Sequence, residues 1–300
     1  MDIVKRIKNI DFELTYLCNL NCKHCYNPTH KASYELSTDK IKSVTKEIKE
    51  LGFKEVHYNG GEPLIRKDIY EILEYSSRLG LKTLLETNAM YLTKFERIRQ
   101  LNNFGIRASI DGSEKVHNYL KEAKTEINPY RTSLENLANL IKLGINVQIT
   151  CSINALNYNS IYTMVNEISN YCLDNIRLRL TMPVGFAISN WLELEMSKEN
   201  VLELRKNIKY IKENFSSIKF DDSSLNRGIP KYEPKFFITP DGFVKPYPFI
   251  DFFVGNVNEE MVSKILEKIA IVKLPEPEEK RIINYLVKIG MVNENEQVGI

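Results

Sequence analysis

Two hydrophobic periodicities alternate along the first 215 residues, and this alternation restricts the fold more than any other property of the sequence. Six segments have the two-residue period of strands, and each is followed by a segment with the 3.6-residue period of an amphipathic helix. Parallel strands need a crossover between them, which a helix supplies. The chain is therefore predicted to be an α/β protein with a parallel sheet. The predicted strands are Phe12–Leu17, Phe53–Tyr58, Leu81–Thr87, Gly105–Ile110, Ile145–Ile153 and Asn175–Thr181.

The predicted helices carry local start and stop signals. The first has Ser37 or Thr38 as its cap and Gly52 as its stop. The others cover residues 66–79, a segment that opens at Thr93, a segment that ends at Gly144, and residues 158–172 and 197–215. Periodicity alone does not separate an open doubly wound sheet from a closed or partly closed barrel.

The pattern changes after about residue 215. KFFITPDGFVKPYPF (235–249) predicts a hairpin that turns at residues 240–242, and two apolar helical segments follow at 259–272 and 280–292. We expect the last helix to pack on the core, with partner binding as the alternative. The predicted division is a barrel-like domain over 8–215 and a C-terminal extension over 216–300.

Charge and composition exclude several classes of protein. The net charge is +2, which is too balanced for binding driven mainly by nucleic-acid phosphates. The N-terminal residues lack the apolar core of a signal peptide, and no run approaches the roughly 18 apolar residues of a membrane span. We expect a cytoplasmic protein that binds neither nucleic acid nor membrane. Five cysteines, three of them clustered, suit a reducing compartment where thiolates bind metal.

The clustered cysteines are Cys18, Cys22 and Cys25, in the loop after the first predicted strand. Three thiolates with this spacing can hold three irons of a cubane [4Fe–4S] cluster and leave the fourth iron open to a substrate or cofactor. Two alternatives stay open at this point. One is a tetrahedral zinc site completed by His24 or His30, and the other is three incidental thiols.

The motif CNLNCKHC (18–25), with Tyr26 after its last cysteine, and GGEP (60–63) after the second strand resemble the radical S-adenosylmethionine (radical SAM) superfamily. The resemblance continues through ETNA (86–89) and SIDGSEKVHN (109–118), in family order. It implies an α/β fold with a partial (β/α)6 barrel and a small C-terminal extension of a hairpin and helices.

The resemblance also implies the chemistry of an enzyme. One [4Fe–4S] cluster on Cys18, Cys22 and Cys25 chelates the amine and carboxylate of SAM through its open iron. An electron, from a donor such as flavodoxin or ferredoxin, then cleaves SAM to methionine and a 5′-deoxyadenosyl radical, which abstracts hydrogen from a substrate.

Residues for SAM follow from the matching motifs. Gly60 and Gly61 let the backbone approach a ligand closely, and their carbonyls can accept from its ammonium. Asn88 and Ser109 end barrel strands, where they can hydrogen-bond a ribose or carboxylate, although either can be a capping residue. The predicted cofactor-binding residues are Tyr26, Gly60, Gly61, Glu62, Asn88 and Ser109, whereas Asp111 and Gly112 are interpreted as a turn.

The C-terminal hairpin resembles the start of a SPASM or Twitch extension. In those extensions a cysteine that helps to bind an auxiliary cluster normally follows PDGxVxP, and here that position is Tyr247. No cysteine lies between Cys172 and residue 300. The resemblance therefore indicates a degenerate extension without an auxiliary cluster.

Three functional interpretations stay open. The first is a radical SAM enzyme that modifies a peptide, for example by epimerisation or crosslinking, and the second is one that acts on a small metabolite in cofactor or antibiotic synthesis. The third is a non-enzymatic iron–sulfur or zinc module. Because the first strand begins by about Ile10, we expect barrel loops or C-terminal helices to recognise any peptide. The candidate substrate contacts are His117, Arg177, Arg179 and Tyr247.

Cys151 lies near the carboxyl end of the fifth predicted strand, where active-site residues of parallel barrels gather. Free cysteine is usually a small apolar filler of the core, which is the first interpretation. The second is that its thiol points into the cavity and donates a hydrogen atom to the substrate radical. Side chains alternate between the two faces of a strand, so either Cys151 or its neighbour Thr150 faces the interior, and the sequence does not decide which.

Overall fold

The computed structural model describes residues 7, 9–27, 34–226, 234–248, 250, 252–273 and 275–291. Among these residues, one sheet is built from ten strands: β1 (Ile10–Glu13), β3 (Glu55–Asn59), β4 (Lys82–Thr87), β5 (Phe104–Ser109), β7 (Asn146–Ile153), β8 (Asn175–Leu180), β9 (Lys219–Asp221), β10 (Phe236–Ile238), β11 (Phe243–Lys245) and β12 (Gly255–Asn256). Its order is β12-β11-β10-β1-β3-β4-β5-β7-β8-β9. All six predicted strands are present, and their neighbours in the sheet pair parallel. The predicted α/β class with a parallel sheet is confirmed.

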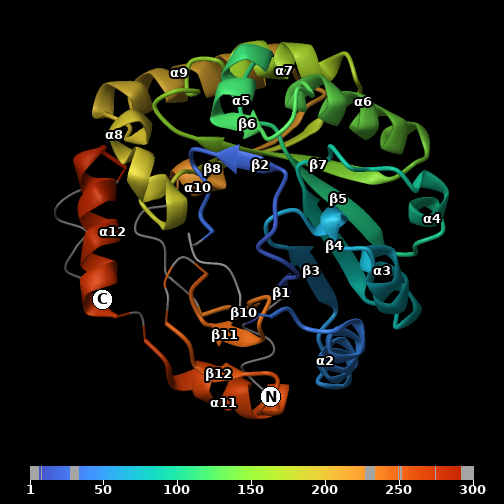
Figure 1. Ribbon diagram of the computed structural model, residues 1–300. Helices are drawn as coiled ribbons and strands as arrows, with labels where there is room; N and C mark the ends of the chain where they lie inside the picture. The colour runs from blue at the N-terminus through green and yellow to red at the C-terminus, as the bar shows by residue number, and fades with distance from the viewer. Residues whose placement is uncertain are drawn as a thin grey trace.

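Helices cover the outer face of the curved sheet, as Figure 1 shows. They are α2 (Thr38–Glu50), α3 (Ile69–Arg78), α4 (Phe95–Arg99), α6 (Pro129–Lys142), α7 (Ile161–Ser169) and α9 (Lys198–Asn214). Ser37 caps α2 as predicted, because its side chain accepts a hydrogen bond from the Lys40 N–H. Helices on one face and an open interior on the other give a partial barrel, not a doubly wound sheet.

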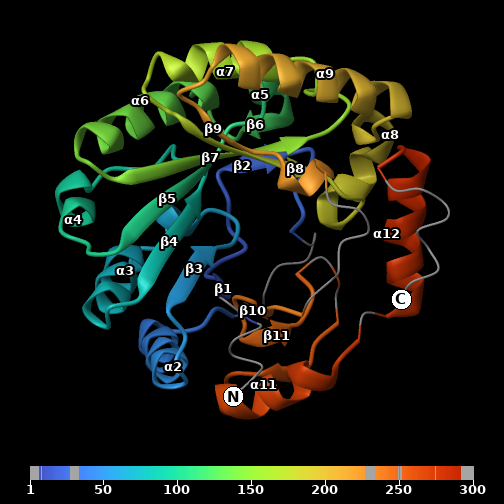
Figure 2. The same ribbon diagram turned by 180° about the vertical axis from the view of Figure 1, so that it is seen from behind.

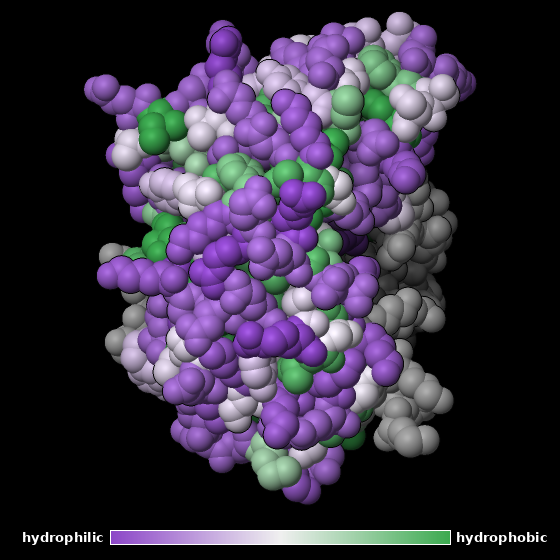
Figure 3. Space-filling view, turned by 90° about the vertical axis from the view of Figure 1, so that its right-hand side faces the viewer, coloured by the Kyte–Doolittle hydropathy of each residue, from purple (hydrophilic) through white to green (hydrophobic). Residues whose placement is uncertain are grey.

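The molecular surface over α3 and α4 is mostly hydrophilic, with hydrophobic residues visible only singly or in small groups (Figure 3). The apolar stripes of these helices face the sheet, where Tyr58 of β3 is fully buried. Its hydroxyl lies 2.6 Å from the Ser76 Oγ of α3 and 3.1 Å from the Thr45 Oγ1 of α2. None of the helices within the described ranges has the length and apolar character that crossing a membrane requires.

The C-terminal hairpin continues the barrel sheet. β10 pairs parallel with β1, and β11 pairs antiparallel with β10, so the predicted hairpin is confirmed. The helices α11 (Val262–Ile271) and α12 (Glu276–Lys288) lie with it on the open side of the barrel in both views (Figures 1 and 2). α12 packs on the core through buried apolar residues, as expected: Ile282, Tyr285 and Leu286. The division at residue 215 stays a prediction.

Several short elements were not predicted from the sequence. They are β2 (Leu20–Cys22), β6 (Lys121–Ala123), β9, β12, α5 (Glu114–Leu120), α8 (Trp191–Leu194), α10 (Ser223–Asn226) and the 3₁₀ turns η1 (Pro63–Ile65) and η2 (Gly185–Asn190). β2 and β6 form a separate antiparallel pair, and three residues are too few to show a period. The first strand ends at Glu13, four residues earlier than predicted, because residues 14–17 leave the sheet.

Residues 14–17 leave the sheet to meet the loop after β3. The Gly61 N–H donates to the Thr15 carbonyl at 2.7 Å, and the Glu62 N–H donates to the Leu17 carbonyl at 2.8 Å. A Cβ on Gly60 would lie 2.4 Å from the Thr15 carbonyl oxygen, and one on Gly61 would lie 2.2 Å from that of Leu17. Both positions therefore need glycine, because this backbone contact leaves no room for a side chain.

The segment that follows, the cysteine loop (Cys18–Asn27), is held from two further sides. The β2–β6 pair fixes its first part, and the Lys23 N–H donates to the Leu120 carbonyl at 2.9 Å. η2 fixes its second part, because the Ala187 N–H donates to the Cys25 carbonyl at 3.0 Å. Gly185 has a φ of +56°, and a Cβ there would lie 2.1 Å from the Tyr26 carbonyl oxygen. The loop's conformation is thus set by backbone contacts.

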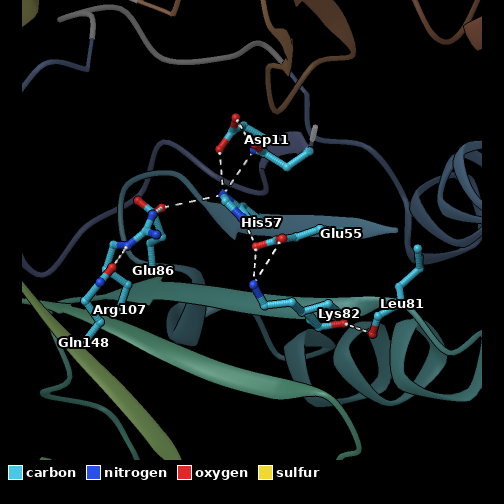
Figure 4. A network of polar contacts seen from close by, with 10 residues as sticks. Asp11, Glu55, His57, Leu81, Lys82, Glu86, Arg107 and Gln148 are labelled. Atoms are coloured by element: carbon cyan, nitrogen blue, oxygen red, sulfur yellow. Dashed lines mark hydrogen bonds and ion pairs between the residues drawn. The ribbon is translucent and has the colours of Figure 1, made fainter. Parts of the chain in front are cut away.

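A polar network crosses the interior face of the barrel two residues before the carboxyl ends of β1 and β3 (Figure 4). His57 Nδ1 lies 3.2 Å from Asp11 Oδ1 and 4.0 Å from Glu86 Oε1, and its Nε2 lies 2.8 Å from Glu55 Oε1. Arg107 in turn pairs with Glu86. Burial opposes protonation of His57, but hydrogen bonds to Asp11 and Glu55 outweigh it and raise its pKa to about 8. The imidazolium links three strands.

We predict that this imidazolium makes stability depend on pH. A histidine whose folded pKa is raised contributes stability that is fully present below its ordinary pKa of about 6.5 and is lost as pH rises through about 8. The loss amounts to about 2 kcal/mol for this shift. Urea unfolding of the metal-free protein at pH 6 and pH 9 measures it, and His57→Gln is expected to lack this part of the pH dependence.

The comparison with His57→Gln is needed because a second group acts in the same direction. Burial raises the pKa of Glu13 to about 8, against the effect of Lys245, so this carboxyl also lowers stability as pH rises from about 4.5. Glu13 is present in both proteins and cancels in their difference. Equal pH dependence in wild type and His57→Gln would contradict the prediction.

We also predict that Gly61→Ala lowers the free energy of unfolding by roughly 3 kcal/mol, since its Cβ must displace the Leu17 backbone. Gly105→Ala is the matched control: that glycine lies in β5, and its Cβ would meet nothing closer than 3.4 Å. The control is expected to stay within about 1 kcal/mol of wild type. Urea unfolding measures the free energy of both variants. Equal stability would contradict the prediction, because it would show that the Leu17 backbone can move at no energetic cost.

Candidate active site

The three clustered cysteines lie half-buried at the carboxyl ends of the barrel strands. Among the described residues, the group of side chains close enough together to hold one metal ion is Asp11, His57 and Glu86, and the cysteines do not belong to it. Four ligands around one zinc ion bring their donor atoms close together, whereas a cubane binds each thiolate at a different iron. The spacing of the thiols therefore fits a cluster better than zinc.

Of the two histidines in the zinc alternative, the structure describes only His24. His24 Nε2 lies 3.2 Å from Asp111 Oδ2, so this nitrogen faces a carboxylate. His30 lies outside the described residues. Burial raises the pKa of the Cys25 thiol to about 11, and it raises that of Cys22 further, partly offset by Lys121. The thiols stay protonated near neutral pH until a metal displaces their protons.

Strand alternation in β7 settles the orientation of Cys151. Ile149, Cys151 and Ile153 are fully buried in the core between sheet and helices, whereas Thr150 and Ser152 face the barrel interior and are half-buried. The Cys151 Sγ lies 3.9 Å from Asn157 Nδ2. Cys151 therefore packs in this core and not on the interior face, and hydrogen donation by its thiol stays a prediction.

Two of the predicted cofactor-binding side chains bind the protein itself. The Glu62 carboxylate accepts from the Asn88 N–H at 2.8 Å, the Leu64 N–H at 3.0 Å and the Thr87 hydroxyl at 2.7 Å. Asn88 Nδ2 donates to Asn19 Oδ1 at 2.8 Å. These bonds tie the loops after β3 and β4 to the cysteine loop.

The other predicted SAM contacts are placed around the same loop. Gly60 and Gly61 touch the residues just before Cys18, and Tyr26 follows Cys25 within the loop. Ser109 ends β5 and is half-buried. The structure thus brings these residues together at one end of the barrel, and their contact with SAM stays a prediction.

Buried polar atoms without a partner among the described residues gather at the same end of the barrel. Of the ten such side-chain atoms among the described residues, four lie there: Glu13 Oε2, Asn59 Oδ1, Thr150 Oγ1 and Thr181 Oγ1. Glu13 and Asn59 end β1 and β3, and Thr181 follows β8. Thr150 lies in β7 beside Ser109, the last residue of β5. Ligands of parallel barrels bind at these strand ends. Because unsatisfied buried polar atoms are costly, such a group fits a site that a polar ligand completes. Of these four residues, only Thr150 is predicted from the sequence as a candidate for the interior, and the other three carry no sequence signal beyond their position near strand ends.

The candidate substrate residues fall into separate places. Arg177 and Arg179 share the interior face of β8, and the Arg177 Nε lies 3.3 Å from Asp221 Oδ2. His117 is 1% exposed, its Nδ1 accepts from the Asp111 N–H at 3.1 Å, and burial lowers its pKa well below the usual value. Tyr247 is buried just after β11. Substrate contact by these four stays a prediction.

Comparison with known proteins agrees with this geometry. The sequence model of the Radical SAM superfamily matches residues 12–167, more than half of the chain. PqqA peptide cyclase of Bradyrhizobium diazoefficiens is 40% identical over 108 residues, which are 34% of this chain and 28% of that protein. The match therefore spans less than a third of that relative's length. AdoMet-dependent heme synthase of Methanosarcina barkeri is 26% identical over 90% of this chain and 85% of its own.

The fold is similar to solved structures. Streptococcus suis SuiB, in its complex with precursor peptide SuiA, superposes with a TM-score of 0.72 over 94% of this chain and 69% of its own, at 15% sequence identity. At this identity the likeness concerns the fold, which is the partial barrel with its C-terminal additions. With the family's sequence pattern over more than half of its length, the chain belongs to the radical SAM superfamily.

Proposed function

We propose that this protein is a radical SAM enzyme that holds one [4Fe–4S] cluster on Cys18, Cys22 and Cys25 and uses SAM to abstract hydrogen from a peptide. The observation that carries the proposal is a loop of three thiols, fixed by backbone contacts, beside a barrel end with four unpartnered polar atoms. When bound, the cluster supplies the electron for reductive cleavage of SAM, and the open iron accounts for the absence of a fourth cysteine.

In this proposal, the protein's own residues bind the iron, orient SAM and enclose the site of reaction. The three thiolates bind iron, and the carbonyls of Gly60 and Gly61 accept from the SAM ammonium. Ser109 and Asn88 lie where they can hydrogen-bond the polar parts of SAM, while Glu62 fixes the loops that carry them. The curved sheet and its outer helices enclose the interior from one side, and a bound substrate that displaces water there would protect a reactive radical.

A peptide substrate is favoured by the polar interior. Asn59, Thr150 and Thr181 offer a carbonyl and two hydroxyls that suit the N–H and C=O groups of a peptide backbone. Arg179 lies on the same face of the sheet and can pair with a carboxylate. Two proteins whose names include a peptide, PqqA peptide cyclase and the SuiB–SuiA complex, support this class.

A small metabolite is the second candidate. It is supported by the similarity to AdoMet-dependent heme synthase, which extends over most of both chains. The name of that relative refers to heme and not to a peptide, so the length of the sequence match and the chemistry of the interior favour different substrate classes.

Residues 216–300 fit a degenerate SPASM or Twitch extension. The hairpin β10–β11 is present, but Tyr247 stands at the position of the expected cysteine. An auxiliary cluster would lack thiolate ligands there, so the proposal includes a single cluster. We place the domain boundary at residue 215.

The electron donor is proposed to approach beside Cys18. Leu17 is 52% exposed there, and a surface hollow of about 580 Å³ lies next to it. Its lining residues are Asn19, Leu64, Ile65, Tyr91, Thr93, Lys124 and Thr125. A flavodoxin or ferredoxin on this surface would be close to the cysteine loop.

We predict that the reconstituted protein, reduced with dithionite under anaerobic conditions, cleaves SAM to 5′-deoxyadenosine. Cys22→Ala is expected to lower the rate by at least about 100-fold, because one iron loses its thiolate. Cys172→Ala is the matched control, since Cys172 is exposed and far along the chain from the loop, and it is expected to cleave normally. Chromatography of 5′-deoxyadenosine measures both, and full cleavage by Cys22→Ala would contradict the assignment.

The same assay separates the substrate classes. A short peptide encoded beside the gene, made with deuterated side chains and Cα positions, is expected to transfer deuterium to 5′-deoxyadenosine. Transfer from a deuterated porphyrin precursor, and none from the peptide, would favour the metabolite.

A further prediction concerns iron content. Reconstituted protein is expected to bind about four irons and four sulfides per chain, and a Cys18, Cys22, Cys25 triple alanine variant none. Iron and sulfide analysis of both proteins decides. About eight irons per chain, with four surviving in the triple variant, would show that the C-terminal extension carries a second cluster.

A further inference from the structure

A buried lysine lies directly opposite one of the cysteines. In the β2–β6 pair, Lys121 is the register partner of Cys22. Directly opposed residues of antiparallel strands project to the same face, with Cβ atoms about 4.5–5.5 Å apart. The Lys121 side chain is only 3% exposed. A cation therefore lies beside the Cys22 sulfur with almost no access to solvent.

Buried partners fix this ammonium in place. Lys121 Nζ lies 2.9 Å from Asp111 Oδ2 and donates to the Ser109 carbonyl at 2.7 Å. Asp111 is fully buried, and its Oδ1 accepts from the Ser152 N–H at 2.6 Å. His24 Nε2 lies 3.2 Å from the same carboxylate. The cation is thus held by strands β5 and β7 of the barrel as well as by its own strand.

Other lysines near the loop differ from Lys121. The Lys23 side chain is 26% exposed, and its Nζ lies 3.4 Å from Glu193 at the surface. Lys124 is exposed and binds the Cys18 carbonyl at 2.8 Å. Solvent and salt screen exposed charges, but a buried charge keeps its effect. Lys121 also acts electrostatically on all three thiols, lowering the pKa of each against the effect of burial.

We propose that Lys121 is a positioning residue for the cluster, whose ammonium, held by Asp111, raises the cluster's reduction potential and stabilises the thiolate of Cys22. The inference rests on the proposed cluster ligation and not on the substrate class. Reduction adds one negative charge to a group that already carries thiolate charge. A fixed cation nearby in a medium of low polarity stabilises that added charge, and net charge and surroundings set the potential of such clusters.

The ion pair is not neutral toward the cluster in this proposal, because its cation acts more strongly than its anion on the nearest ligand. Lys121 is the register partner of Cys22, and its charge lowers the pKa of that thiol by more than the charge of Asp111 raises it. Removing both charges is therefore expected to lower the potential, though less than removing the lysine alone.

The test is a redox titration of the reconstituted protein followed by electron paramagnetic resonance. At a fixed potential, Lys121→Met is expected to show an approximately tenfold lower ratio of reduced to oxidised cluster, equivalent to about 59 mV for one electron. Lys121→Arg is expected to stay near wild type. Lys23→Met, whose ammonium neighbours Cys22 in sequence but faces solvent, is the matched control and is expected to leave the ratio unchanged.

Lys121→Met alone leaves the buried Asp111 carboxylate without its cation and could misfold for that reason. The double variant Lys121→Met with Asp111→Asn removes both charges and serves as the control. A lower ratio in this variant supports the proposal, and the wild-type ratio overturns it. If the double variant takes up no iron while Lys121→Arg does, the positive charge is needed to hold the thiolates, which also supports it. Iron loss from both would show that side-chain shape matters and not charge, and would overturn it.

Failure of the underlying function is distinguishable from failure of this inference. A wild-type protein without a cluster refutes ligation by the three cysteines and this inference with it. A wild-type cluster whose potential is the same in all variants refutes the role of Lys121 alone.

Discussion

The contact between the backbone of residues 60–62 and that of residues 15–17 determines where the cysteine loop lies. Two hydrogen bonds of 2.7 and 2.8 Å join the segments, and glycine at positions 60 and 61 is the condition for them. Flexible thiols would have to be ordered at each metal-binding event, at a cost in conformational entropy. Here the loop is ordered beforehand by contacts that involve no cysteine side chain, so its shape does not depend on the ligand.

The interior of the barrel is divided between satisfied and unsatisfied polar groups. Farther from the carboxyl ends, His57 pairs with the carboxylates of Asp11, Glu55 and Glu86. This polar layer joins neighbouring strands across the interior face. Toward the carboxyl ends, the side-chain oxygens of Asn59, Thr150 and Thr181 have no hydrogen-bond partner among the described residues. One layer therefore stabilises the fold, while the next is left for a ligand.

The periodic segments and the three cysteines could be read from the sequence, because each depends on local pattern. Strands and helices repeat at fixed intervals, and Cys18, Cys22 and Cys25 lie within eight positions. Other features depend on contacts between distant segments. Cys151 could not be oriented without the phase of β7, and Lys121 became significant only when β6 paired with β2. Asp111, interpreted as part of a turn, proved to bind a buried cation as well.

The pairing of β10 with β1 also affects how the chain is made. β1 joins a partner that follows it by more than two hundred positions, so one edge of this fully buried strand stays open until residues 236–238 have left the ribosome. At about 5–20 residues per second, that interval lasts on the order of ten seconds or more. Throughout it, this strand, which leads into the cysteine loop and carries the apolar Ile10 and Phe12, has one edge exposed to other chains, and iron delivered early would meet an unfinished barrel.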